Sequence, residues 1–199
     1  MVVVNINHRL NVLGYLDLSA FGEEYAHSAN VGNWDLIWAL KWVKDNIGFF
    51  GGDRDNVTIF GQSGGGGKTI SVMNMPYSAG LYHKAMVMSG VTTNLLSHKS
   101  LPAEDIVRRM LENLGSNDVR ILSAITQREL ADNYLRAFKE LGGERMPFLG
   151  PTANQDYIGD PFDVGFTEYA KSVPMIVGSN FSEFVNLPPQ YHRSEMSNE

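Results

Sequence analysis

The sequence predicts an α/β protein with a mostly parallel sheet, helices on both faces of the sheet and a helical insertion. Two observations lead to this prediction. Short apolar segments alternate with amphipathic helical patterns in the first half of the chain, and residues 101–141 carry helical patterns without a strand signal. A strand, helix, strand order requires crossover connections, which are right-handed in nearly all parallel sheets.

Four short segments are predicted as strands buried on both faces, because they are continuous apolar runs rather than alternating ones. The first two are rich in β-branched residues and the last two contain methionine. They are residues 2–6, 57–60, 85–88 and 174–177.

A helix is predicted between the first two strands. Its apolar residues recur at spacings of four, three and four; they are Leu36, Leu40, Val43 and Ile47. Asp35 is expected in the first turn, where a carboxylate favours the helix dipole, and Gly48 is expected to stop the helix.

Two further helices are predicted in residues 101–141. The first opens with Pro102 and stops at Gly115. The second starts at Thr126, which forms a capping box with Glu129 three residues later, while Ile125 and Leu130 are placed as a hydrophobic staple.

One domain is expected from 199 residues. It divides into core strands and a catalytic turn over residues 1–92, a helical insertion over 93–145, a return to the sheet over 146–186, and a flexible tail over 187–199. No internal repeat or interdomain linker is visible.

Composition excludes several classes of protein. The 16 Lys and Arg residues against 22 Asp and Glu residues give a net charge of −6, which disfavours a nucleic-acid partner. The chain has no Cys, so no disulfide is available, and no metal-ligand spacing appears. We expect no metal, no cofactor and no membrane partner. The Cys-free composition and the lack of a visible signal peptide favour a cytoplasmic location.

The motif with chemical meaning is Gly61-Gln62-Ser63-Gly64-Gly65, which fits G-x-S-x-G between a predicted strand and a helical stretch over residues 68–75. In such a nucleophile elbow a sharp turn exposes the serine hydroxyl, and glycines two residues to either side avoid a collision. The Gly64 N–H at the helix start would then face a developing oxyanion.

A glycine-rich turn without catalytic function is the alternative. Each Gly in a helix is about 0.8–1 kcal/mol worse than Ala, so residues 64–67 oppose the helix. Close approach by a substrate or by the neighbouring strand would explain bare backbone there, and the sequence does not separate the two.

A nucleotide-binding loop is a second alternative, because Gly66-Gly67-Lys68-Thr69 follows a strand. The pattern G-x-x-x-x-G-K-[ST] requires Gly at position 62, where this chain has Gln62. No acidic residue closes the strand at 85–88 to hold Mg²⁺. The NTPase hypothesis is therefore disfavoured.

Several blocks together resemble the active-site region of the type-B carboxylesterases, the cholinesterase-like branch of the α/β-hydrolase fold. The longest is Phe50-Gly51-Gly52, four residues, then residues 57–60 and the G-x-S-x-G motif; residues 7–10, 39–43 and 84–90 agree with it. The glycine run followed by Lys68 is similar to bacterial para-nitrobenzyl-esterase-type members.

The resemblance implies an α/β-hydrolase fold and a cofactor-free serine hydrolase that acts on small-molecule carboxylic esters. Ser63 matches the family nucleophile and Gly64 an oxyanion-hole amide. Glu183 matches the acid that orients the catalytic histidine, although Ser182 and Phe184 depart from the usual Asp-Glu-Gly. Ser89 resembles a family serine that hydrogen-bonds the acid.

The resemblance also implies that the chain matches only the middle of longer proteins. The other oxyanion loop would precede residue 1, and the catalytic histidine would follow Glu183 by a long segment. Each of the five histidines is interpreted as a surface or packing residue; they are His8, His27, His83, His98 and His192. The isolated chain is therefore expected to be nearly inert, and self-association through an exposed sheet edge is expected. A non-catalytic hydrolase-fold interaction protein is the alternative function.

Overall fold

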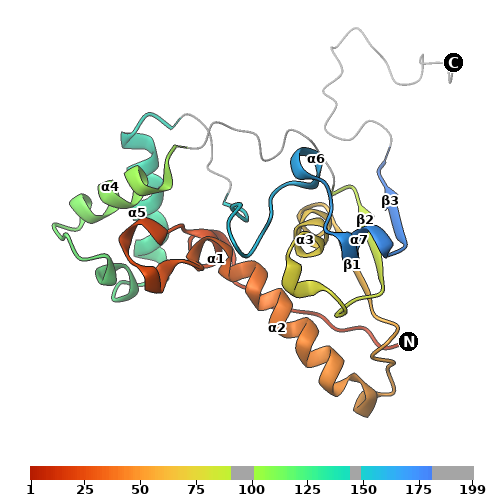
Figure 1. Ribbon diagram of the computed structural model, residues 1–199. Helices are drawn as coiled ribbons and strands as arrows, with labels where there is room; N and C mark the ends of the chain where they lie inside the picture. Colours follow the sequence, from red (N-terminus) through yellow and green to blue (C-terminus); the bar gives the residue numbers. More distant parts are fainter. Residues whose placement is uncertain (91–100, 144–148, 181–199) are drawn as a thin grey trace, which may run out of the picture.

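A small parallel sheet with its helices and a separate helical lobe make up the described part of the chain (Figure 1). The computed structural model describes residues 1–90, 101–143 and 149–180. The expected tail at 187–199 and Glu183 lie outside these residues. No helix in the described ranges is long and apolar enough to cross a membrane.

The sheet has three parallel strands in the order β1-β2-β3. They are β1 (Thr58–Gln62), β2 (Lys84–Met88) and β3 (Met175–Gly178). Three of the four predicted strands are thus confirmed, and the parallel order is as expected. The register pairs Gln62 with Met88 and Met88 with Gly178, so the carboxyl ends of all three strands meet at one edge.

The described helices that pack on this sheet lie on one of its faces. Helix α3 (Gly64–Met73) lies against β1 and β2, and α2 (Val31–Asn46) packs on α3. On the same face, Ala170 of α7 (Glu168–Ser172) packs with Met73 and Ala85. The short α6 (Pro161–Val164) precedes α7.

The other face remains open in the described residues. Phe60, at the centre of β1, is 57% exposed. The expectation that the strands are buried on both faces is therefore not met here, because the described helices that pack on the sheet lie on the α3 side.

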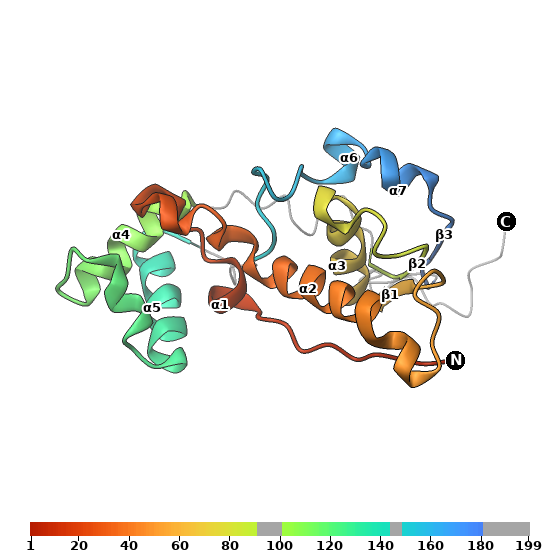
Figure 2. The same ribbon diagram turned by 60° about the horizontal axis from the view of Figure 1, so that its bottom comes forward.

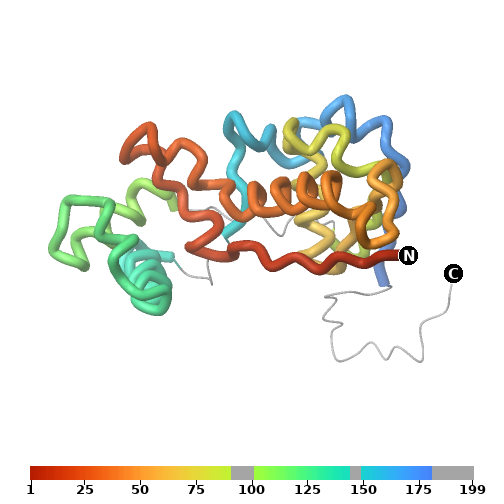
Figure 3. Tube along the Cα trace, turned by 90° about the horizontal axis from the view of Figure 1, so that it is seen from below, coloured from red at the N-terminus to blue at the C-terminus, as the bar shows by residue number. Residues whose placement is uncertain are grey.

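Residues 2–6 do not form the predicted strand. The segment has no ladder partner, and Val3 is 62% exposed. Figure 3 shows the N-terminal segment running alongside α2. Because β1 pairs only with β2 within the described residues, no neighbouring strand is present to satisfy the backbone of residues 2–6.

Helix α2 confirms the predicted apolar stripe but begins earlier than expected. Since it starts at Val31, Asp35 lies in the second turn rather than the first. There Asp35 accepts hydrogen bonds from the Arg9 backbone and guanidinium, at 2.9 and 2.8 Å. The helix ends at Asn46 and continues as a 3₁₀ turn over Ile47–Phe50.

The helical lobe is built from α4 (Ala103–Asn113), α5 (Gln127–Glu140) and α1 (Asn11–Tyr15). Both predicted insertion helices are confirmed, and the capping box of Thr126 and Glu129 is present. Helix α1, which was not predicted, contributes Val12 to the same core as Met110 and Leu130.

Short 3₁₀ turns connect these elements. They are Ser19–Phe21, Glu23–Tyr25, Ser28–Asn30, Pro76–Ser78 and Val119–Ser123. Figure 2 shows α2 reaching from the side of the sheet to the region where α1 meets the lobe.

Candidate active site

Ser63 is the single residue between β1 and α3, and its backbone is strained. Its φ is +53° and its ψ is −121°, outside the regions that a non-glycine residue favours. The Ser63 N–H donates to the carbonyl of Met88 at 2.8 Å, and the Ser63 carbonyl accepts from Gly67 N–H at 3.0 Å. The residue is exposed at the carboxyl edge of the sheet. Strand pairing and the first helical bond therefore hold Ser63 in a conformation that costs about 1–3 kcal/mol.

The glycine at position 61 is required by backbone contact. A Cβ built there would lie 2.2 Å from the carbonyl carbon of Gly65. The expectation for Gly65 differs from the finding, because a Cβ at Gly65 would meet no atom within 4 Å among the described residues. The crowding is therefore one-sided. A side chain at position 61 would collide with the backbone of Gly65, whereas a side chain at position 65 would point into open space.

Gly66 explains part of the glycine run. A Cβ at Gly66 would lie 2.8 Å from the Cα of Gly90, and a Cβ at Gly90 would lie 2.4 Å from the Cα of Gly66. Of the two explanations left open by the sequence, close approach of the neighbouring strand end thus applies to Gly66. Gly90 was not singled out from the sequence, although it directly follows Ser89 at the end of β2.

Gly64 is the first residue of α3 and is exposed next to Ser63. The first amides of a helix have no carbonyl partner within the helix, and they lie at its positive end. This N–H is therefore available to an acceptor at the edge where Ser63 lies.

Ser89 lies at the same edge, one strand away from Ser63. Its φ is +51°, and its N–H donates to the carbonyl of Gly178 at 2.7 Å. The ends of β1, β2 and β3 are thus bonded to one another in sequence. Glu183 follows Gly178 five positions later and lies outside the described residues.

No described histidine hydrogen-bonds the Ser63 hydroxyl, and His98 and His192 lie outside the described ranges. His83 lies at the opposite end of the sheet, where its Nδ1 accepts from Val57 N–H at 3.2 Å. His8 lies near Lys68. Burial, and then the positive charge of Lys68, lower the pKa of His8 from its ordinary value.

His27 and Asp156 form a pair that the sequence did not indicate, because 129 positions separate them. Nδ1 of His27 lies 2.8 Å from Oδ2 of Asp156; the side chain of Asp156 is fully buried and that of His27 is 58% exposed. The pair lies near the C-terminal end of α3, since Ile158 N–H donates to the carbonyl of Asn74. Ten residues of helix span about 15 Å. His27 is therefore a carboxylate-oriented histidine at the wrong end of α3 to reach Ser63.

Lys68, the lysine that a nucleotide-binding loop would use for phosphate, instead contacts another side chain of this chain. Nζ of Lys68 donates to Oη of Tyr15 at 2.9 Å. Within the ranges that the structure covers, no group of three or more His, Cys, Asp or Glu residues could hold a metal ion.

Comparison with known proteins gives one consistent result. The family model described as "Carboxylesterase family" matches residues 1–199. Para-nitrobenzyl esterase of Bacillus subtilis (strain 168) is 34% identical over 92% of this chain and 37% of its own length. Cocaine esterase of Homo sapiens is 35% identical over 97% of this chain and 33% of its own length.

Solved structures agree with the sequence comparisons. An esterase from anaerobic Clostridium hathewayi, described as able to hydrolyse aliphatic aromatic polyesters, has 44% identity and a TM-score of 0.82, with 96% of this chain and 39% of that chain covered. A thermophilic para-nitrobenzyl esterase has 30% identity and a TM-score of 0.75, with 94% and 40% covered. These relatives share the α/β-hydrolase fold, and the chain spans about a third of the length of the curated relatives it matches. Because the family model matches residues 1–199 of this chain, the chain belongs to the carboxylesterase family, in agreement with the resemblance in its sequence.

Proposed function

We propose that this chain carries the nucleophile of a serine carboxylic-ester hydrolase and that Ser63 is that nucleophile. The observation that carries the proposal is the backbone of Ser63, which is held at φ +53° between a strand and a helix and leaves the residue exposed. A strained, exposed serine at the carboxyl edge of a parallel sheet is where an α/β-hydrolase places its nucleophile.

The reaction follows from the groups at this edge. Oγ of Ser63 attacks the acyl carbon of the ester, its proton passes to a histidine, and the carbonyl electron pair moves onto the oxygen. Gly64 N–H donates to that oxyanion. Collapse of the intermediate releases the alcohol, which takes the proton from the histidine. Water then attacks the acyl-enzyme in the same way and restores Ser63.

The acid and the base complete the assignment. We assign Glu183 as the carboxylate that orients the histidine, because β3 ends at the edge that holds Ser63. We assign Ser89 as a support for that carboxylate. His8, His27 and His83 lie elsewhere, so the general base is a histidine outside the described residues. Gly61 permits the turn, and Gly65 supplies the backbone against which it closes.

The proposed organisation is one partial hydrolase domain with a helical insertion over residues 93–145. The proposed substrates are small carboxylic esters, of which para-nitrobenzyl esters are the first to test, because a Bacillus subtilis relative is named for them. Self-association through the open edge of β1 is part of the same proposal.

Labelling with a fluorophosphonate tests the assignment of Ser63. Because the isolated chain is expected to be nearly inert, the probe should modify wild-type Ser63 slowly, and Ser63→Ala should abolish that labelling. Peptide mass spectrometry locates the modified residue. Ser19→Ala is the matched control, because Ser19 is exposed and distant in sequence, and it should leave labelling unchanged.

Two results would contradict the proposal. Labelling that persists in Ser63→Ala would assign the reactive group elsewhere. A chain that is folded by circular dichroism and does not label at all would favour the non-catalytic interaction protein instead.

A further inference from the structure

Four side chains form a closed hydrogen-bond circuit behind the Ser63 turn, which we call the Lys68 ring. Nζ of Lys68 donates to Oη of Tyr15 at 2.9 Å, and Oη of Tyr15 donates to Oδ1 of Asn33 at 2.9 Å. Nδ2 of Asn33 donates to Oγ of Ser71 at 3.0 Å, and Oγ of Ser71 donates to the carbonyl of Lys68 at 2.9 Å. The circuit leaves α3, passes through α1 and α2, and returns to α3.

The Lys68 ring is largely shielded from water. Tyr15, Asn33 and Ser71 are buried, and burial raises the pKa of Tyr15 to about 12, so that its hydroxyl stays protonated and can donate. Burial also lowers the pKa of Lys68. In such surroundings a polar group that loses its hydrogen-bond partner keeps its full desolvation penalty, so each member depends on the others.

The charged groups near the Lys68 ring do not neutralise the positive charge of Lys68. Asp35 is bonded to Arg9, and the nearby imidazole of His8 is itself a base. Among the described residues Lys68 has no carboxylate partner, and its side-chain ammonium donates to Tyr15. An apolar side chain would pack here at a lower desolvation cost, which indicates that the direction of this hydrogen bond matters.

The position of Lys68 in α3 explains why that direction matters. The first four residues of α3 are glycines, which offer no side chain to pack, and a Cβ at Gly64 or Gly65 would meet nothing within 4 Å. Lys68 is therefore the first side chain that can anchor the helix after Ser63. It directly follows Gly67, whose N–H donates to the carbonyl of Ser63.

Packing on α2 holds one member of the Lys68 ring, Tyr15, in place. A Cβ at Gly32 would lie 2.6 Å from Cζ of Tyr15, so the phenol group of Tyr15 packs directly on the start of α2. Val12 and Leu16, which flank Tyr15 in the chain, pack into the helical lobe. The lobe and the nucleophile helix are thus joined through Tyr15.

We propose that Lys68 is a positioning residue for Ser63: through Tyr15, Asn33 and Ser71 it fixes the glycine-only first turn of α3. This inference rests on the proposed function for its consequence in catalysis. Its structural part, the restraint of residues 63–67, is independent of that function.

Hydrogen exchange of the full chain tests the restraint directly. In Lys68→Met and in Tyr15→Phe, the Gly67 amide should exchange about tenfold faster or more than in the wild type, because the helix loses its first side-chain anchor. The double variant should exchange no faster than the single ones, since both break one circuit. Lys68→Arg, which keeps a donor, should recover part of the protection.

Lys41→Met is the matched control, because Lys41 lies on α2 with its Nζ over the ring of Trp38, away from the circuit. It should leave exchange at Gly67 unchanged. Equal exchange at Gly67 in Lys68→Met and in the control overturns the proposal. So does an increase that spreads evenly over α4 and α5, because that reports only a loss of global stability.

Fluorophosphonate kinetics then separate the two proposals. With Ser63 reactive, Lys68→Met should lower the maximal labelling rate at least tenfold and leave the half-saturating probe concentration unchanged, since the nucleophile is misplaced and the binding surface is intact. Faster exchange at Gly67 together with no labelling of the wild type supports the ring and contradicts the function of Ser63. An unchanged labelling rate in Lys68→Met contradicts the positioning role.

Discussion

The Ser63 turn and the helical lobe, two regions of one molecule, are stabilised by different kinds of contact. In the lobe, α4 and α5 bury one stripe each and expose the other, and the core forms from apolar side chains such as Ile106, Met110 and Leu130. At the turn, the close contacts are between backbone atoms of Gly61, Gly65, Gly66 and Gly90. Packing of apolar side chains stabilises the lobe. The turn instead needs glycines, because its backbone segments approach too closely to leave room for side chains.

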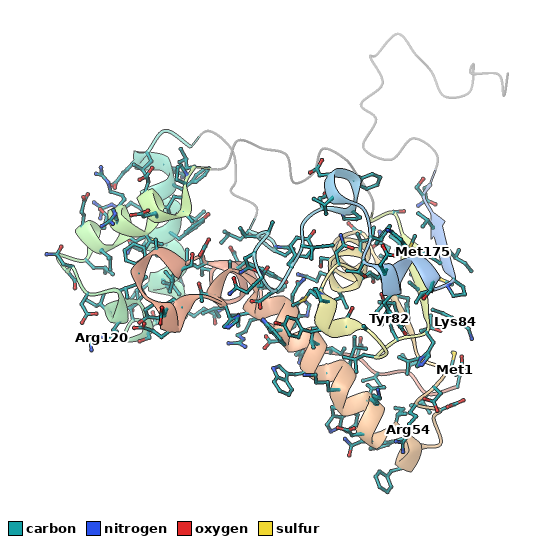
Figure 4. The ribbon with its side chains drawn as sticks, viewed as in Figure 1. Met1, Arg54, Tyr82, Lys84, Arg120 and Met175 are labelled. Atoms are coloured by element: carbon teal, nitrogen blue, oxygen red, sulfur yellow. The ribbon has the colours of Figure 1, made fainter. Side chains whose placement is uncertain are left out.

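The two regions also differ in the strain they contain. The described non-glycine residues with positive φ are Asn11, Ser63 and Ser89, and the last two lie at the carboxyl edge of the sheet. Figure 4 shows Tyr82, Lys84 and Met175 near one another in the sheet region, whereas Arg120 lies far away at the tip of the lobe. The edge of the sheet thus contains two strained serines, whereas the lobe contains one strained residue, Asn11 at the start of α1.

Adding one methyl group at the turn should have the largest effect. Gly61→Ala should lower the free energy of unfolding by about 4 kcal/mol or more, because its Cβ would collide with the backbone of Gly65. Urea denaturation followed by circular dichroism measures the loss. Gly65→Ala is the control: with open space around it, it should stabilise α3 by up to about 1 kcal/mol. Equal losses in both variants would contradict the one-sided crowding.

Removing side-chain volume in the lobe should come next. Met110 is fully buried in the lobe core, so Met110→Ala should lower the free energy of unfolding by about 3 kcal/mol. Met175→Ala, at a partly exposed position of β3, should cost less than about 1 kcal/mol by the same measurement. If the two losses were equal, the lobe would not contain an independent core.

The ion pair of Arg9 and Asp35 should have a smaller and pH-dependent effect. Hydrogen bonding to Arg9 lowers the pKa of Asp35 below its ordinary value of 3.8. The stability from the pair is therefore complete above that value and is lost as the pH falls through the lower pKa of the folded state. Arg9→Met should cost about 1 kcal/mol at pH 6, because Arg9 is half exposed, and the difference should vanish in strong acid. A difference that stayed constant between pH 6 and pH 2 would exclude this ion pair as its cause.

The capping box of α5 should give the smallest loss. Oγ1 of Thr126 accepts from Glu129 N–H at 3.2 Å, so Thr126→Ala should lower the free energy of unfolding by about 1 kcal/mol. Thr152→Ala, at an exposed position, is the matched control and should be neutral. An unchanged stability of Thr126→Ala in urea denaturation would show that packing alone holds α5.

The features that could be predicted from the sequence are those that depend on residues close together in the chain. The stripe of α2, the capping box at Thr126 and the strands β1 to β3 depend on neighbours within about four positions, so a local pattern was sufficient. The prediction of a strand at residues 2–6 was wrong, because a strand needs a pairing partner and no local pattern reveals one. In the structure Val3 is exposed.

Long-range pairs account for the rest of the site. Gly90 against Gly66, His27 on Asp156 and Lys68 on Tyr15 join positions far apart in the sequence, and no residue in these pairs carries a signal that names its partner. Glu183 was placed by resemblance, and only the end of β3 lies in the described residues to support it.

The order of the residues by itself determined the carboxylesterase resemblance, the glycine-flanked serine and the amphipathic helices, because each is written in short, contiguous segments. Only the tertiary structure decided which glycines are required, which face of the sheet stays open and which side chains anchor α3 behind Ser63. The physical reason is that excluded volume and hydrogen bonding act between atoms that are close in space, and folding alone brings those atoms together.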